Sequence, residues 1–240
     1  MSETRRLNLK AYKRKLARAR EHRRLIRLHR YECAAFERGF ILIGGVDEVG
    51  RGPLAGPVVA ACVVTDRPLM LKGLDDSKKV RPEQRIELAE QIKASALFWA
   101  IGEASVAEIE RINIYHASIL AMERALAALL QLPHYLLTDA VRIRSFGGEQ
   151  LPVIKGDAKC ATVAAASIVA KVHRDALLVE LDRDFPQYGF AEHKGYSTPQ
   201  HQAALSKHGP CEHHRRHFLR VQNALSLFEF EATRATLVEA

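Results

Sequence analysis

The chain has 240 residues, 48% of them hydrophobic and 27% charged, which is the composition of a globular protein that folds without disulfide or metal crosslinks. No stretch approaches the roughly 18 consecutive apolar residues of a membrane-spanning helix, and the charged first residues are unlike a secretory signal peptide. The net charge of +8 is unevenly distributed, because residues 1–30 hold twelve basic and two acidic side chains. This segment is typical of polyanion binding, to nucleic acid or an anionic membrane face, with a merely solubilising helix as the alternative.

In chain order, helical spacing first predicts a basic helix over residues 5–38, which Gly39 ends. Short runs rich in Ile, Leu and Val predict buried strands over 40–47, 57–65, 97–105, 134–138 and 151–154. Further helices are expected over 82–95, 107–131, 158–182 and 217–232, with a loop-rich stretch from 186 to 210. Strands in quick succession, followed by strands separated by helices, indicate an α/β fold with a mixed sheet.

The cysteines contain no C-x-x-C pair and are expected to be free thiols, which indicates a reducing, cytoplasmic location. They are Cys33, Cys62, Cys160 and Cys211. The His- and Cys-rich stretch over 208–217 lacks the ligand spacing of a zinc finger, so zinc is not expected there.

Acidic residues stand at the ends of two predicted strands and on one helix. Asp47 and Glu48 end the first strand, Asp139 ends a later one, and Asp175 lies on the Ala-rich helix. Converging carboxylates favour Mg²⁺ or Mn²⁺, and two such ions can assist hydrolysis of a phosphodiester. Asp139 taken alone is more typical of a turn or a helix cap, and Lys171 stands four residues before Asp175, the spacing of a helical ion pair.

Several separate motifs resemble, in the same order, those of the bacterial ribonuclease HII family, the type 2 ribonucleases H. The similarity covers about residues 31–220. The matching segments are 45–58, 76–79, 113–114, 155–158, 165–172, 174–175, 188–190, 193–196, 209–210 and 214–215.

The resemblance implies a ribonuclease H-like fold, in which helices flank a five-stranded mixed sheet. It implies a monomeric endonuclease that cuts the RNA strand of RNA–DNA hybrids. It also implies incision 5′ to single ribonucleotides in duplex DNA, leaving 3′-hydroxyl and 5′-phosphate ends. We therefore expect a basic helical extension over 1–38, a catalytic domain over 39–220, and a C-terminal helix and tail over 221–240.

The same resemblance assigns roles to individual residues. It makes Asp47, Glu48, Asp139 and Asp175 the catalytic ligands of two Mn²⁺ or Mg²⁺ ions. It assigns recognition of the ribose 2′-hydroxyl to Gly50, Arg51 and Gly52, and contact with the next sugar to Tyr196. Phosphate contacts are expected from Lys78, Lys155 and His193.

This sequence departs from the family pattern at a few positions. Ala140 and Val141 stand where Gly and Asn are common, Ser197 where Gly is frequent, and His217 where Ser is common. These changes affect loops and remove no carboxylate.

Three alternatives remain at this stage. A type 3 ribonuclease H tends to need a separate N-terminal domain, for which about 40 residues are too few. A carboxylate-pair glycosidase would need an aromatic-rich cleft, but the chain has one Trp. A non-catalytic duplex-binding module would use the basic segment alone and would show no metal-dependent turnover.

Overall fold

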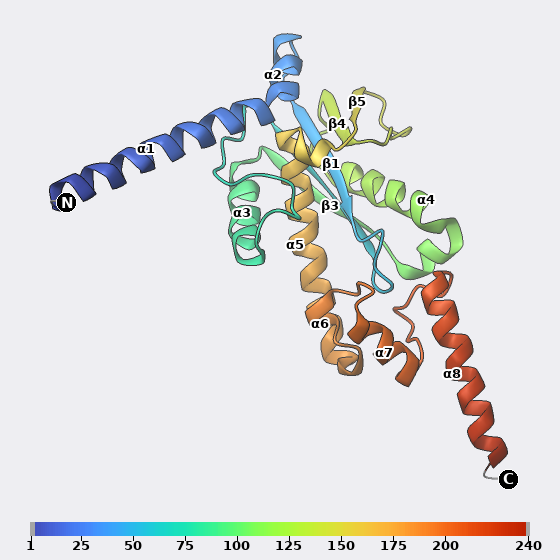
Figure 1. Ribbon diagram of the computed structural model, residues 1–240. Coiled ribbons are helices and arrows are strands. Elements are labelled where there is room, and N and C mark those ends of the chain that lie inside the picture. Colours follow the sequence, from blue (N-terminus) through green and yellow to red (C-terminus); the bar gives the residue numbers. More distant parts are fainter. Residues whose placement is uncertain (1–2, 239–240) are drawn as a thin grey trace. The chain divides into compact units, whose positions relative to one another are not determined.

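The computed structural model describes the backbone of residues 3–238 and the side chains of residues 12–230 (Figure 1). Residue contacts divide the chain into two compact units, which are described separately. Unit 1 comprises Met1–Asp47, Cys62–Trp99 and Leu129–Val169. Unit 2 comprises Glu48–Ala61, Ala100–Ala128 and Ala170–Ala240. The division expected from the sequence, at residues 38 and 220, stays a prediction.

Five strands form one sheet in the order β3-β2-β1-β4-β5. They are β1 (Ile43–Val49), β2 (Val58–Thr65), β3 (Phe98–Ala104), β4 (Tyr135–Asp139) and β5 (Glu149–Val153). β4 runs parallel to both β1 and β5, with Val46 opposite Thr138 and Leu137 opposite Leu151. Figure 1 shows β4 and β5 side by side. The predicted five-stranded mixed sheet with flanking helices is confirmed.

The predicted helices are present, with bounds that shift by a few residues, and α6 and α7 form in addition to them. They are α1 (Glu3–Leu28), α2 (Arg30–Glu37), α3 (Pro82–Ser95), α4 (Val106–Ala127), α5 (Ala161–Asp184), α6 (Phe190–His193), α7 (Pro199–His208) and α8 (Leu219–Val238). Two single 3₁₀ turns, η1 (Gly156–Ala158) and η2 (Pro186–Tyr188), precede α5 and α6. No helix among residues 3–238 is long and apolar enough to cross a membrane.

Two predicted helices are interrupted. The expected helix over 5–38 breaks at His29, whose buried ring bonds through Nδ1 to the Leu25 carbonyl, 2.7 Å away, so α2 starts anew. The expected helix over 107–131 is kinked at Asn113, which has φ +66°. The Asn113 side-chain oxygen accepts hydrogen bonds from the Tyr115 and His116 amides, so it caps the second half of the helix.

The expectation of a loop-rich stretch over 186–210 is wrong for its second half, where α7 forms. Thr198 caps this helix by accepting a hydrogen bond from the His201 amide, and Pro199 occupies the first turn. Both residues are standard helix-start signals, but the weak apolar periodicity of the segment hid them.

The core of unit 1 forms where β1, β4 and β5 meet α2 and the start of α5. Its buried residues are Ala35, Ile43, Tyr135, Leu137, Val153, Cys160 and Val163. A Cβ at Gly45 would lie 2.2 Å from the Thr162 carbonyl carbon, so glycine is needed for α5 to approach β1. The buried Glu32 carboxylate accepts from the Thr162 amide and hydroxyl, which ties α2 to the first turn of α5.

Two hydrophobic clusters lie among the described residues of unit 2. One joins α7 and α8 through Leu205, Val221 and Ala224, with Leu54 from the segment after β1. The other comprises Ala55, Leu178, Tyr188 and Phe190. Leu54 and Ala55 take part in one cluster each, so the segment between β1 and β2 is anchored in this unit's core.

Candidate active site

Two of the predicted catalytic acids lie in unit 1 on neighbouring parallel strands. Asp139 is the last residue of β4, whereas β1 does not end at Asp47 as expected but continues to Val49. β1 and β4 are paired as far as Val46 and Thr138, and Asp47 and Asp139 are the next residues. Since equivalent positions of parallel strands face the same side, the two carboxylates extend from one edge of the sheet. Asp139 Oδ1 accepts a hydrogen bond from the Gly156 amide at 2.8 Å, which fixes one oxygen and leaves the group able to bind a cation.

The electrostatic potential at this edge of the sheet is negative. Burial raises the pKa of Asp157, and the carboxylates of Asp76 and Asp139 raise it further. Burial lowers the pKa of Lys78, but the charges of Asp157, Asp76 and Asp47 outweigh that effect and raise it overall. The Lys78 ammonium lies 3.5 Å from Asp157. A site where several carboxylates act on one another in this way suits a hard divalent cation.

The other two predicted acids belong to unit 2, and each has a basic neighbour. The Glu48 carboxylate lies 3.3 Å from the Arg51 guanidinium. Asp175 pairs with Lys171 at 2.5 Å, the helical ion pair that the sequence offered as an alternative. The Lys171 ammonium also lies 5.4 Å from the centre of the Tyr196 ring, so Lys171 connects Asp175 with the tyrosine expected to contact substrate.

The remaining predicted contacts differ in accessibility. Lys155 is exposed and adopts a left-handed φ of +59° just before η1. His193 is buried, with Nε2 bonded to the Tyr188 carbonyl at 2.8 Å and Nδ1 accepting from the Gly195 amide at 3.2 Å. Since the backbone uses both ring nitrogens, His193 in this conformation shapes the Tyr196 loop. Its contact with phosphate stays a prediction.

The donor chemistry of the predicted metal ligands is uniform, because all four are carboxylates. An oxygen-only set fits Mg²⁺ or Mn²⁺ and is a poor fit for zinc. Among the side chains of residues 12–230, no group of three or more His, Cys, Asp or Glu is arranged to hold an ion. The assignment of Asp47, Glu48, Asp139 and Asp175 as ligands therefore stays a prediction.

Two histidines of unit 2, His201 and His214, bond to each other in a chain with a defined tautomer order. The Cys211 amide donates to His214 Nδ1 at 3.0 Å, so His214 Nε2 carries the proton that bonds His201 Nε2 at 3.0 Å. His201 Nδ1 then donates to the Tyr196 carbonyl at 2.9 Å. Burial lowers the pKa of His201 to about 4 and that of His214 to about 3, so both rings are neutral at pH 7.

Sequence reasoning missed the roles of three buried charged residues that lie within the matching motifs. Asp157 holds Lys78, while Arg174 and Arg215 are fully buried and bond to backbone carbonyls. For Asp157, the signal was an acid directly after Lys155 and Gly156 at the end of a buried strand. Nothing in the local pattern distinguishes the two arginines from solvated ones.

A family model described as Ribonuclease HII matches residues 44–221, about three quarters of the chain. The chain belongs to the ribonuclease HII family. A ribonuclease HII from Myxococcus xanthus (strain DK1622) is 50% identical over 208 residues, which cover 86% of this chain and 71% of the relative. Membership of this family excludes two alternatives from the sequence analysis, a type 3 ribonuclease H and a non-catalytic duplex-binding module.

Two solved structures share the fold of this chain. The ribonuclease H2 from Pyrococcus horikoshii OT3 superposes with a TM-score of 0.67 at 25% identity, covering 78% of this chain and 99% of that one. Bst-RNase HIII in complex with Mn²⁺ superposes at 0.62 with 22% identity, covering 82% and 73%, which is a likeness of fold alone. As a ribonuclease HII, the chain is a divalent-metal-dependent endonuclease for RNA–DNA hybrids and embedded ribonucleotides.

Proposed function

We propose that this ribonuclease HII hydrolyses the RNA strand of hybrids and incises duplex DNA on the 5′ side of a single ribonucleotide. The products carry 3′-hydroxyl and 5′-phosphate ends. The observation that carries the proposal is the pair Asp47 and Asp139. They follow the last paired residues of two neighbouring parallel strands, the potential there is negative, and both lie within the segment that matches the family. Free cysteines suit a cytoplasmic enzyme, and we propose that it acts as a monomer.

In this proposal, Asp47, Glu48, Asp139 and Asp175 bind two Mn²⁺ or Mg²⁺ ions. When bound, such ions polarise the phosphate and lower the pKa of the attacking water. The Gly156 amide orients the Asp139 carboxylate, and Arg51 orients Glu48.

In the same proposal, other residues recognise the substrate. Gly50, Arg51 and Gly52 contact the 2′-hydroxyl, the group that separates RNA from DNA at one position. Tyr196 is 41% exposed, so its ring can pack on a sugar, and Lys171 beside it keeps the ring oriented. Lys78, exposed and tethered to Asp157, is placed for a backbone phosphate near Asp47.

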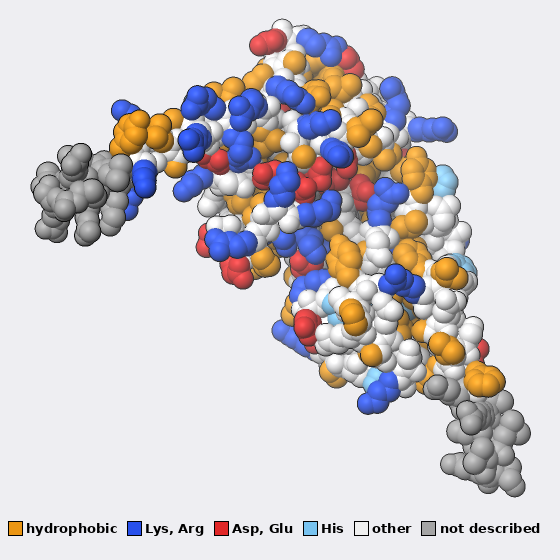
Figure 2. Space-filling view, in the orientation of Figure 1, with side chains coloured by type: hydrophobic (Ala, Val, Ile, Leu, Met, Phe, Trp, Pro, Cys, Tyr) orange, Lys and Arg blue, Asp and Glu red, His pale blue; other side chains and the backbone are white. Residues whose placement is uncertain are grey.

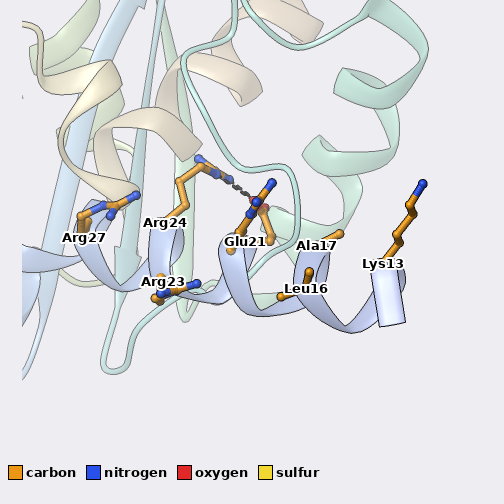
Figure 3. A pocket seen from close by; sticks show the side chains of 8 residues that line it. Lys13, Leu16, Ala17, Glu21, Arg23, Arg24 and Arg27 are labelled. Atoms are coloured by element: carbon orange, nitrogen blue, oxygen red, sulfur yellow. Dashed lines mark hydrogen bonds and ion pairs between the residues drawn. The ribbon is translucent and has the colours of Figure 1, made fainter. Parts of the chain in front are cut away.

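We also assign α1 to binding of the duplex backbone. Figure 2 shows Lys and Arg side chains along α1, and Figure 3 shows Lys13, Arg23, Arg24 and Arg27 on it, with Arg24 bonded to Glu21. A continuous row of cations neutralises successive phosphates without regard to sequence.

A neighbouring groove of unit 1 continues this basic surface toward the predicted site. Its lining includes Arg27 and Arg30 from α1 and α2, together with Lys79 and Lys159. Lys79 follows Lys78, and Lys159 lies two residues after Asp157, so the groove borders the segments that carry these site residues. We propose that a flank of the duplex follows the groove onto α1.

The direct test compares Asp47→Asn with Asp66→Asn, an exposed aspartate just after β2. Asp47→Asn should lower turnover of a single-ribonucleotide duplex by about three orders of magnitude or more, since one metal ligand is lost, while duplex affinity changes little. Asp66→Asn should leave both quantities unchanged. Wild-type turnover in Asp47→Asn would contradict the assignment.

A further inference from the structure

The segment from Gly50 to Pro57, here called the Gly50–Pro57 loop, lies against two arginines that are completely buried. Arg174, from α5, and Arg215, from the segment before α8, both have no exposed surface. Burying a guanidinium is costly unless its N–H groups are all hydrogen-bonded. Where those bonds go therefore shows what the two arginines hold.

Arg215 bonds to the loop along most of its length. Its Nη2 donates to the Gly50 carbonyl at 2.6 Å and its Nη1 to the Arg51 carbonyl at 3.1 Å and the Pro53 carbonyl at 2.8 Å. Nε and Nη2 reach the Gly56 carbonyl at 3.0 and 2.7 Å. Nη2 also donates to the Pro57 carbonyl at 3.3 Å, so one side chain fixes the orientation of five peptide groups in the loop.

Arg174 connects the end of the same loop with the tyrosine loop. It donates to the Ala55 carbonyl at 2.9 Å, the Pro57 carbonyl at 3.0 Å and the Lys194 carbonyl at 3.0 Å. Lys194 lies two residues before Tyr196. The two elements expected to contact the ribonucleotide and the next sugar therefore share one buried guanidinium.

The space around Gly50 is filled by Arg174. Gly50 has φ +96°, and a Cβ there would lie 2.3 Å from Arg174 Nε and 2.8 Å from the Pro57 carbonyl oxygen. In contrast, a Cβ at Gly52 would meet nothing within 4 Å. Gly50 is therefore required by packing against the arginine, whereas Gly52 leaves an open approach from solvent.

The peptide orientation has a direct consequence for recognition. In a trans peptide the N–H points opposite to the carbonyl of the preceding residue. Because the carbonyls of Gly50 and Arg51 point to Arg215, the amides of Arg51 and Gly52 point away from it. Both residues are exposed, and their two consecutive N–H groups lie on the side of the loop opposite to the positive charge of Arg215.

The charge behind the loop is retained at neutral pH. Burial, together with repulsion from Arg174, lowers the pKa of Arg215 to about 9, so the side chain is still protonated at pH 7. Among the described residues, the hydrogen bonds of both guanidinium groups go to backbone carbonyls, which do not cancel the charge. The outward amides are thus better donors to an oxygen acceptor than amides of an ordinary turn.

We propose that Arg174 and Arg215 are positioning residues that set selectivity for a ribonucleotide, by turning the Arg51 and Gly52 amides toward the 2′-oxygen. This rests on the proposed contact between the Gly50–Gly52 segment and the 2′-hydroxyl. Neither arginine touches substrate. Their effect is on the difference in affinity between a ribonucleotide and a deoxynucleotide at the same position, and not on duplex binding in general.

The test measures binding of two duplexes of equal sequence, one with a single ribonucleotide and one all-DNA, in EDTA so that neither is cut. The variants are Arg215→Lys and Arg174→Lys, which keep the charge but lose the fork of donors. For either variant, the preference for the ribonucleotide duplex should fall about tenfold toward equal binding, the equivalent of one well-placed hydrogen bond. Affinity for the all-DNA duplex should change less than twofold.

The matched control is Arg85→Lys, because Arg85 is also buried and bonds to the Ser77 and Val80 carbonyls of unit 1. It should leave the preference intact, although duplex affinity falls if Lys78 is displaced. Retention of the wild-type preference by both arginine variants would overturn the inference alone. A wild-type protein with no preference would overturn the proposed 2′-hydroxyl contact together with it.

If Arg215→Lys does not fold, Arg174→Lys carries the test, since it loses only three carbonyl bonds. A second readout uses turnover. Cleavage of the single-ribonucleotide duplex should fall more than cleavage of a long hybrid, which offers many 2′-hydroxyls. An equal loss on both substrates, with an unchanged preference in binding, would indicate a purely structural role and overturn the proposal.

Discussion

On α1 the arginines Arg23 and Arg27 extend into solvent, whereas Arg174 and Arg215 of unit 2 are buried against the Gly50–Pro57 loop. The exposed side chains keep their charge and their flexibility available for a partner. The buried ones donate to the protein's own carbonyls. The same residue type therefore supplies affinity for a polyanion in one region and backbone geometry in the other.

The two roles should respond differently to salt. Exposed cations act through released counterions, so their contribution falls steeply as salt rises. Buried guanidiniums are screened much less, so the geometry that they impose persists. Overall duplex affinity should depend strongly on salt, while the preference for a ribonucleotide should depend on it weakly.

The largest effect on duplex binding is expected from shortening α1. Residues 1–20 contain eight basic side chains and one acidic one. Deleting them should weaken duplex binding by on the order of 100-fold in low salt and flatten its salt dependence. The cut ends at residue 20 because Glu21 bonds to the Gly73 amide, and Leu25 and Leu28 are buried.

The control for this deletion keeps the helix and removes charge only, with Lys13, Arg14 and Lys15 replaced by Gln. It should reduce the salt slope by about 0.9 for each phosphate that these side chains no longer neutralise. An unchanged slope in both variants, measured by anisotropy from 50 to 300 mM salt, would show that α1 is not on the nucleic acid.

A second comparison lies within the Gly50–Pro57 loop. Gly50→Ala places a Cβ against Arg174 at a left-handed φ, so the free energy of unfolding should fall by about 2–4 kcal/mol. Gly52→Ala should change it by less than about 0.5 kcal/mol, because the space there is open. Urea denaturation measures both. Equal stability of the two variants would contradict the described packing against Arg174.

Acid should weaken the buried histidine chain of unit 2. The pKa of His201 is lowered to about 4 and that of His214 to about 3 by burial, so the unfolded chain binds protons first as pH falls below 6.5. This stability is full above pH 6.5 and is lost toward pH 4, at up to about 1.4 kcal/mol per pH unit for each histidine.

Urea denaturation between pH 6.5 and 5, run on the wild type and on His201→Gln, measures this effect, because the raised pKa values of the Glu32 and Asp157 carboxyls act on both proteins alike. His201→Gln should reduce the slope. If the free energy of unfolding of the wild type were constant from pH 6.5 to 5, the two buried histidines would take up protons as readily in the folded as in the unfolded chain, which would contradict the prediction.

The smallest effect concerns Ala140, directly after Asp139. It has φ +56°, a left-handed conformation in which an L side chain is strained. Ala140→Gly should stabilise the protein by about 1 kcal/mol, which raises the melting temperature by roughly 2–4 °C. Ala128→Gly, at an ordinary helical φ of −84°, should not stabilise it. A lower melting temperature for Ala140→Gly would contradict the prediction.

Much of the fold could be predicted from local pattern. β2, with eight buried residues in VVAACVVT, and α3, which starts at Pro82, lie where their sequence signals place them. The breaks at His29 and Asn113 could not, because they depend on side-chain bonds to particular backbone groups. A residue of either type inside a periodic helical stretch gives no warning of such a bond.

The candidate site divides in the same way. Asp47 and Asp139 could be singled out because a carboxylate next to a buried strand is costly unless it is paired or bound to a metal, which indicates a functional role. Arg174 and Arg215 could not, because their burial depends on carbonyl groups of the Gly50–Pro57 loop that turn toward them only in the folded chain. Helical spacing and composition both treat arginine as a surface residue.

The most direct measurement is a gel assay on a labelled DNA duplex with one ribonucleotide, run with Mg²⁺, with Mn²⁺ and with EDTA. The account predicts a metal-dependent cut on the 5′ side of the ribonucleotide, with a 3′-hydroxyl on one fragment and a 5′-phosphate on the other. Cleavage of a long hybrid but not of this duplex would contradict the role of the Gly50–Pro57 loop. Absence of cleavage of both substrates with either metal would contradict the account as a whole.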